Sequence, residues 1–250
     1  MINLKRSIKA ISIALILITT TLISYSFINN NKPIRKIITT YCFPTIVDGK
    51  IYELIDSTSI IYKDNVTLYE MMPNHTAKIN KDSIICEEVK YKYFILRKGD
   101  KYGFLYDSLN TINNHKFLAD SLLQKTGFLD GDLFKNKNKY ILNKILKNKS
   151  EYAKIEVFIP KRNEESSPDT TLIYYSKGLK NIDFSLSQSL DNYNKVKVCK
   201  IEFVFNAKFN NAKKMIFPKS KHWFSIKEDT ISDLSKYDDF INIFNAKYKT

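Results

Sequence analysis

The chain has 250 residues, 44% of them hydrophobic and 13% aromatic, which is enough to build a packed core and excludes wholesale disorder. Lysine and arginine number 40 against 26 aspartates and glutamates, so the formal net charge is +14. Glycine and proline contribute only six residues each, which excludes collagen-like and Gly/Pro-rich low-complexity chains.

The first 28 residues have the pattern of an export signal. Three basic residues within the first nine positions precede an uncharged run over residues 10–28, and a basic stretch before an apolar run is typical of export. The run is about as long as a membrane-spanning helix, which favours an uncleaved single transmembrane anchor. Ser24 and Ser26 have the spacing of a cleavage site, so a signal peptide removed after Ser26 is the alternative.

The remainder of the chain is expected outside the cytoplasm. A short N-terminus cannot hold a domain, and large C-terminal portions are translocated regardless of loop charge. We expect a linker over residues 29–44 and one extracytoplasmic domain over residues 45–250. The predicted location is the cell envelope, and the first predicted partner is the membrane, through the N-terminal segment.

Three β-hairpins are predicted in the first half of this domain. Asp48-Gly49 separates two short apolar runs and is the favoured sequence of a two-residue hairpin loop. A second hairpin is predicted to join residues 59–62 to 66–69, and a third to join 91–97 to 102–106. Aromatic and β-branched residues are enriched in these runs, as in strands generally.

Two helices are predicted in the middle of the chain, over residues 115–126 and 139–149. In the first, leucines recur on one helical face and Gly127 follows the end. In the second, apolar residues fall on one face, and lysines occupy the other.

Strands return in the second half, and the clearest is 195–205, where polar and apolar residues alternate. The other candidates are 155–159, 171–175 and 182–186, with short edge-like pieces at 215–217 and 223–226. A closing helix over about residues 230–246 carries apolar residues three and four positions apart. Hairpins joined by a helical middle predict an α+β fold: a mainly antiparallel sheet with two or three packing helices.

Cysteine usage permits one disulfide bond in an oxidising compartment. The three cysteines are Cys42, Cys86 and Cys199, and the last lies in the clearest strand, so Cys86–Cys199 is the candidate pair. The alternative is that all three are small buried hydrophobic residues.

Several common site chemistries lack their motifs. The spacing of the six glycines excludes a dinucleotide fingerprint, a Walker-A loop and a nucleophile elbow. H-E-x-x-H and C-x-x-C sequences are also missing. We therefore assign no catalytic residue, cofactor or metal ligand. The neighbours His222 and Trp223 are a candidate ligand-stacking site, although a surface or core-edge pair is favoured.

The basic charge is concentrated in stretches without acids. Residues 135–149 contain six lysines and no acid. A basic amphipathic helix can bind an anionic surface, and the candidate residues for binding anionic lipid or polysaccharide are Lys137, Lys139, Lys144 and Lys147. Lysines on a solvated face are the favoured alternative. Of the 40 basic residues 36 are lysine, whereas phosphate recognition usually enlists arginine, so nucleic acid is not an expected partner.

These features predict an exported, membrane-tethered envelope protein with a non-enzymatic binding, structural or assembly role. Two alternatives remain: an exported hydrolase with a dispersed active site, and a lysine-rich module that binds anionic lipid or polysaccharide. Protein partners are not specified by the sequence.

Overall fold

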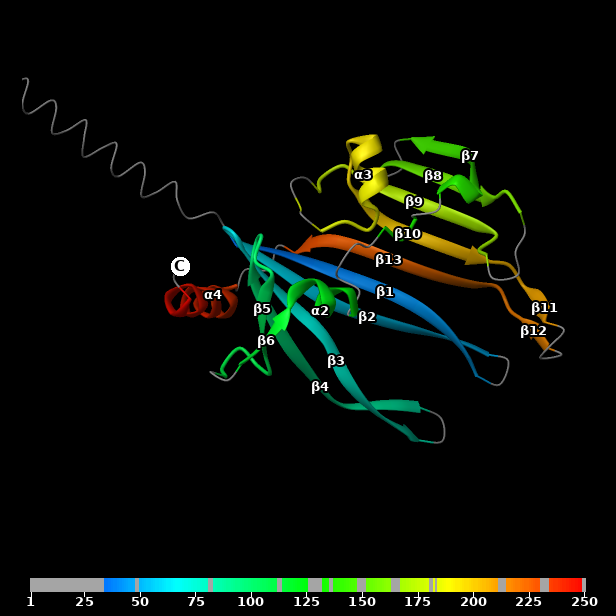
Figure 1. Ribbon diagram of the computed structural model, residues 1–250. Coiled ribbons are helices and arrows are strands. Elements are labelled where there is room, and N and C mark those ends of the chain that lie inside the picture. The colour runs from blue at the N-terminus through cyan, green and yellow to red at the C-terminus, as the bar shows by residue number, and fades with distance from the viewer. Residues whose placement is uncertain are drawn as a thin grey trace, which may run out of the picture. The chain divides into compact units, whose positions relative to one another are not determined.

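The computed structural model describes residues 34–47, 50–80, 83–111, 114–125, 132–134, 137–147, 152–162, 167–179, 182, 184–210, 215–229 and 234–248. Residues Arg35–Thr250 form one compact unit (Figure 1). The predicted signal or anchor over residues 1–28 lies outside the described residues. Among the residues that are described, no helix is long and apolar enough to cross a membrane.

The unit is built on one antiparallel sheet of 11 strands, in the order β6-β5-β4-β3-β2-β1-β13-β10-β9-β8-β7. The strands are β1 (Arg35–Val47), β2 (Lys50–Lys63), β3 (Val66–Asn80), β4 (Ser83–Arg97), β5 (Tyr102–Tyr106), β6 (Asn114–Leu118), β7 (Tyr140–Lys147), β8 (Tyr152–Pro160), β9 (Thr170–Ser176), β10 (Val198–Phe205) and β13 (Ser220–Asp229). The sheet therefore consists of two meanders, β1–β6 and β7–β10, and β13 joins them by pairing with both β1 and β10.

The helical segments are few and short. They are α2 (Ala119–Lys125), the 3-10 turn η1 (Lys137–Lys139), α3 (Gln188–Asn194) and α4 (Ser235–Lys247). A two-stranded ribbon, β11 (Lys208–Asn210) with β12 (Met215–Phe217), connects β10 to β13. The predicted α+β class with a mainly antiparallel sheet is confirmed.

All three predicted hairpins are confirmed. Val47 pairs with Lys50, which is the register of a two-residue loop. The second turn uses Asp64 at a φ of 53°, and the third uses Gly99 at a φ of 92°, the left-handed region that tight turns need. The first strand is longer than expected: β1 begins at Arg35, inside the stretch predicted as a linker over residues 29–44.

The prediction of two helices in the middle of the chain is largely wrong. Residues 115–118 of the first belong to strand β6 (Asn114–Leu118), and only the residues that follow form α2. The second is replaced by strand β7, which pairs with β8 and places Lys144 opposite Val157. A short apolar run fits a strand as well as a helix, and here the neighbouring strand decides the outcome.

Further differences lie in the second half of the chain. Ile182 and residues 184–187 form no strand and lead into α3, which the sequence did not predict. Residues 223–226 belong to β13, which is central in the sheet rather than at its edge. The strand at 215–217 and the closing helix, observed as α4, are confirmed.

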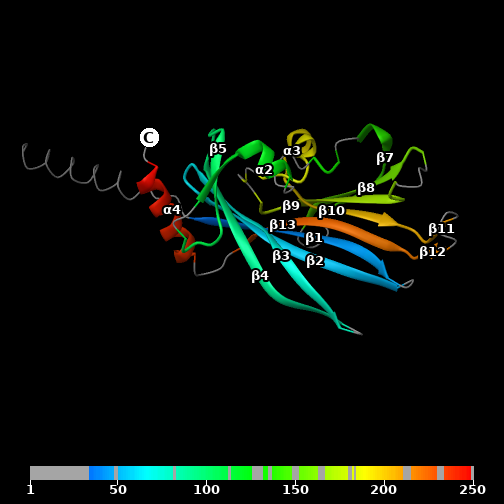
Figure 2. The same cartoon turned by 60° about the horizontal axis from the view of Figure 1, so that its bottom comes forward.

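One face of the sheet carries the main core, and we call it the helix-covered face. Residues from α2 and α3, such as Leu123 and Leu190, belong to the same buried cluster as Ile37, Ile60 and Ile201 of the central strands. Both helices lie over this side in the two views (Figures 1 and 2).

Helix α4 packs on the opposite face. Tyr106 and Phe104 of β5 point away from the helix-covered face. The ring centroid of Tyr106 lies 4.9 Å from that of Phe240, and the ring centroid of Phe104 lies 4.3 Å from that of Tyr248. The buried residues of α4 are Tyr237, Phe240, Ile241 and Phe244, so the helix uses the apolar face that its three- and four-residue spacing predicts.

The predicted Cys86–Cys199 disulfide is incompatible with the sheet order. Cys86 lies in β4 and Cys199 in β10, and four strands separate the two. Five strand spacings amount to roughly 24 Å, whereas the Cα atoms of a disulfide lie within about 7 Å. Cys42 and Cys199 are both buried, as the alternative for these two residues predicts.

Candidate functional site

An aromatic strip crosses three central strands on the helix-covered face. We use this name for the side chains of Tyr41, Phe43, Phe203, Phe205, His222 and Phe224. Register places them on one face, because Tyr41 pairs with Phe224 and Phe203 with His222. The ring of Phe43 lies 5.4 Å from Phe224 and 6.1 Å from His222, both edge-on. These are favourable aromatic geometries.

The strip continues the core out to solvent. Phe203 and Phe224 pack against the buried cluster beneath the helices. Farther along the same face Phe43 is 41% exposed, and its cross-strand neighbour Leu54 is 48% exposed. Tyr52 and Val47 are similarly exposed. Contiguous exposed apolar side chains of this kind are typical of interaction sites.

The strip is electrically neutral at physiological pH. Burial lowers the pKa of His222 below its ordinary value, so the imidazole stays uncharged among the rings of Phe43 and Phe205. Burial, followed by a hydrogen bond to Asp56, raises the pKa of Tyr41. His222 therefore acts as part of an apolar surface and is not positioned as a charged group.

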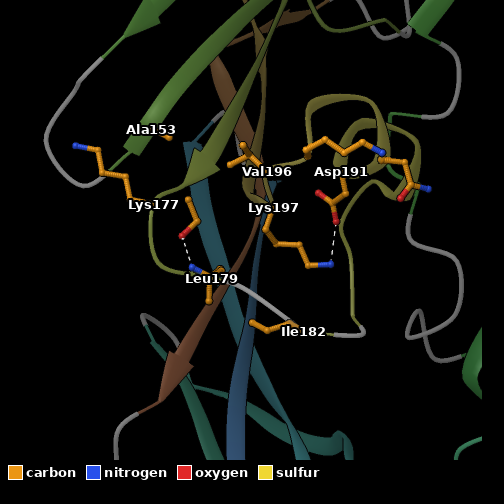
Figure 3. A pocket seen from close by; sticks show the side chains of 10 residues that line it. Ala153, Lys177, Leu179, Ile182, Asp191, Val196 and Lys197 are labelled. Atoms are coloured by element: carbon orange, nitrogen blue, oxygen red, sulfur yellow. Dashed lines mark hydrogen bonds and ion pairs between the residues drawn. The ribbon is translucent and has the colours of Figure 1, made fainter.

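A pocket of about 620 Å³ lies beside α3 (Figure 3). Its apolar lining comes from Ala153, Leu179, Ile182 and Val196. Its polar lining consists of Ser176, Lys177, Asp191, Asn192, Lys195 and Lys197. The pocket thus combines an apolar floor with three lysines and one carboxylate.

The carboxylate of Asp191 is held by the fold itself. It accepts the backbone N–H of Val198 at 2.6 Å and the Ser185 hydroxyl at 2.6 Å. Lys197 Nζ lies 2.9 Å away, and the two side chains are only 15% and 12% exposed. These contacts tie α3 to the start of β10.

A second pocket of about 560 Å³ shares Ser176 and Leu179 with the first. It is lined by Trp223 and Lys200, among others. Lys200 Nζ lies 5.2 Å from the ring centroids of both Tyr174 and Trp223, and 2.9 Å from the Glu202 carboxylate. The ammonium group is therefore already engaged by aromatic rings and an acid.

The candidate pair His222 and Trp223 does not form one stacking site. Successive residues of a strand point to opposite faces, so His222 joins the aromatic strip while Trp223 lines the second pocket. The alternation of Tyr41 and Phe43 in the sequence is the signal that could have revealed the strip. The pocket beside α3 had no such signal, because its lining residues come from two different strands, from α3 itself and from loops.

The four candidate lysines lie at one edge of the sheet. Lys137 and Lys139 are in η1, and Lys144 and Lys147 are in the edge strand β7. Lys137 Nζ lies 4.3 Å from the ring centroid of Tyr193. The predicted amphipathic helix does not form, because residues 140–147 are a strand. Binding of these lysines to an anionic surface stays a prediction. Within the described residues, no group of three His, Cys, Asp or Glu could hold a metal ion.

Comparisons with known proteins give little guidance. No protein-family model matches the chain, and no curated protein matches it. Among solved structures, one similar chain is described as a "putative outer membrane lipoprotein-sorting protein domain" from Vibrio parahaemolyticus, at 14% identity. The match covers 84% of this chain and 90% of that chain with a TM-score of 0.15, which does not establish a shared fold.

Proposed function

We propose that this chain is an exported, membrane-tethered envelope protein whose sheet domain binds an apolar ligand on the aromatic strip, namely the acyl chain of a lipid. The observation that supports this proposal most strongly is the apolar path from the buried core, through Phe224, to the exposed side chains of Phe43 and Leu54. A monomeric domain rarely exposes such a path without a partner.

An acyl chain suits this surface better than a charged or sugar-like ligand. The strip offers aromatic edges and aliphatic groups, and its one imidazole is kept neutral by burial. A domain tethered through residues 10–28 would lie next to the membrane, where lipid is the most abundant apolar partner. The pattern of basic residues before that run supports the export that this proposal requires.

Displacement of a fluorescent fatty acid by neutral alcohols tests the proposal. Each methylene buried on the strip contributes about 0.8 kcal/mol, so affinity should rise about fourfold per added carbon from octanol to dodecanol. The double variant Phe43→Ser/Leu54→Ser should lose most of this dependence on chain length.

Ile243→Ser provides the matched control, because Ile243 is also an exposed aliphatic residue, 65% exposed, but lies on α4 on the opposite face. This variant should bind like the wild type. Affinity that does not change with chain length, or equal loss in the control variant, contradicts the proposal. Binding of a neutral polysaccharide with no binding of alcohols contradicts it as well.

The predicted export is tested separately from ligand binding. Cell fractionation should place the chain in the membrane fraction, and N-terminal sequencing should return Met1. A sequence that begins after Ser26 would show a cleaved signal and contradict the tether, though not the export. Recovery of the chain in the cytosol contradicts export.

A further inference from the structure

We propose that the pocket beside α3 is a second binding site, which takes an anionic amphiphile: a phosphate or carboxylate group attached to a short apolar body. This inference goes beyond the proposed function and uses a different part of the molecule. It rests on the size of the pocket, on the chemistry of its lining, and on the contacts within the protein that offset the charge of its one carboxylate, Asp191.

The size and lining of the pocket suit a small ligand. About 620 Å³ is within the range of small-molecule sites, roughly 300–1,000 Å³. Leu179, Ile182 and Val196 supply an apolar floor, and Ile182 is only 6% exposed. An apolar body can therefore be removed from water inside the pocket.

The charge of the lining favours an anion. Lys177, Lys195 and Lys197 line the pocket together with the single carboxylate of Asp191. The Asp191 carboxylate pairs with Lys197 and accepts hydrogen bonds from the Val198 N–H and the Ser185 hydroxyl. Its negative charge is therefore offset by groups of the protein itself. The formal charge of the four groups is +2, so the lining attracts a phosphate or carboxylate.

The backbone that carries two of these lysines is held in place. Lys195 adopts a left-handed conformation, φ 55°, and its N–H bonds to the Asp191 carbonyl at the end of α3. Lys177 begins a turn in which the Ser176 hydroxyl oxygen accepts the N–H groups of Gly178 at 3.0 Å and Leu179 at 2.9 Å. Figure 3 shows Lys177 and Lys197 on separate segments: Lys197 turns toward Asp191, with which it pairs, and Lys177 extends away from them. A fixed backbone lowers the entropy cost of binding.

Calorimetric titration of the full chain with hexyl phosphate tests this site. We expect saturable binding that weakens as salt is raised, and much weaker binding of inorganic phosphate and of hexanol. The double variant Lys177→Gln/Lys195→Gln should reduce hexyl phosphate affinity by about tenfold, since each exposed ion pair contributes up to roughly fivefold. Lys197 is left intact because it holds Asp191 in the fold.

The control Lys219→Gln/Lys236→Gln removes the same charge at exposed positions outside the pocket. Its affinity should equal that of the wild type, and circular dichroism should show every variant folded. The strip variant Phe43→Ser/Leu54→Ser should also retain hexyl phosphate binding, which separates this site from the proposed acyl-chain site. Loss of binding in the strip variant would mean that the ligand occupies the strip, and this outcome overturns the proposal.

Three other outcomes overturn it. Unchanged affinity of the Lys177→Gln/Lys195→Gln variant for hexyl phosphate would show that these lysines do not contribute to binding. In the strip variant Phe43→Ser/Leu54→Ser, hexanol binding as tightly as hexyl phosphate would show that the site does not need an anion. Inorganic phosphate binding equally tightly would show that it does not need an apolar body.

Discussion

The hydroxyl group of Tyr175 donates a 2.7 Å hydrogen bond to the carboxylate of Glu156, and both side chains are almost completely buried beneath α3. Lys154 Nζ lies 2.7 Å from the other carboxylate oxygen and also bonds to Asn194 of the helix. Asn194 in turn donates to the Tyr175 hydroxyl at 2.8 Å. This closed network of four side chains fixes α3 on the sheet, at the edge of the pocket proposed to bind an anion.

The first prediction concerns this network. Tyr175→Phe should lower the free energy of unfolding by about 1–3 kcal/mol, because Glu156 loses a buried hydrogen-bond donor. Urea denaturation monitored by circular dichroism measures the change. Tyr193→Phe is the control, since Tyr193 is 75% exposed, and it should change stability by less than about 0.5 kcal/mol. Equal effects of the two substitutions would argue against the network.

A second prediction follows from the close approach of Phe94 to Gly103. A Cβ atom added to Gly103 would lie 2.6 Å from Phe94 Cε2 and 2.8 Å from the Ile95 carbonyl oxygen. Gly103→Ala should therefore cost about 1–3 kcal/mol of stability through overpacking. Gly178→Ala should be nearly neutral, because nothing lies within 4 Å of its added Cβ. Thermal melts of both variants, run side by side, would show the contrast.

The third prediction concerns stability at low pH. Burial acts to raise the pKa of Glu202, but hydrogen bonds and charge interactions with Lys200 and Lys221 outweigh it and lower the pKa below its ordinary value. A carboxylate whose pKa is lower in the folded state stabilises the fold above its unfolded pKa. That contribution is lost as the pH falls through the folded pKa.

The melting temperature of the wild type should consequently fall more steeply than that of Glu202→Gln between about pH 6 and pH 3. Glu53→Gln replaces an exposed carboxylate of β2 and should follow the wild-type curve. Parallel curves for wild type and Glu202→Gln would show that Glu202 makes no such contribution.

A fourth prediction concerns the cysteines. Burial raises the pKa of the Cys42 thiol, and the residue is fully buried, so Cys42 should react with a thiol reagent only slowly in the folded protein and readily in urea. Mass spectrometry of digests prepared without reductant should contain no Cys86–Cys199 peptide pair. Detection of that pair would contradict the strand order of the sheet.

The parts of the fold that the sequence predicts correctly are those governed by local signals. Asp48-Gly49 is a favoured hairpin-loop sequence and Gly99 adopts a positive φ that few other residues tolerate, and the strands on either side of them pair as expected. Helix α4 has an apolar stripe that only a helix can bury on one side.

Features set by distant pairing could not be predicted in this way. Residues 140–147 have apolar residues in adjacent pairs, a pattern that a helix and an edge strand satisfy equally, and β8 selects the strand. The pocket beside α3 depends on where Ser176, Ile182 and Lys197 meet in space. Only the aromatic strip had a sequence signal, the alternation along β1, and its partners on β10 and β13 come from far along the chain.

The position of β13 has a consequence for how the molecule is made. Its pairing with β1 joins Lys36 to Asp229, close to opposite ends of the domain. Until the last strand emerges during synthesis, the first meander has an unsatisfied edge at β1 and the second has one at β10. Non-local pairing of this kind slows folding and leaves open strand edges that aggregate. A chain with this topology can complete its sheet only when the final strand inserts between its two halves.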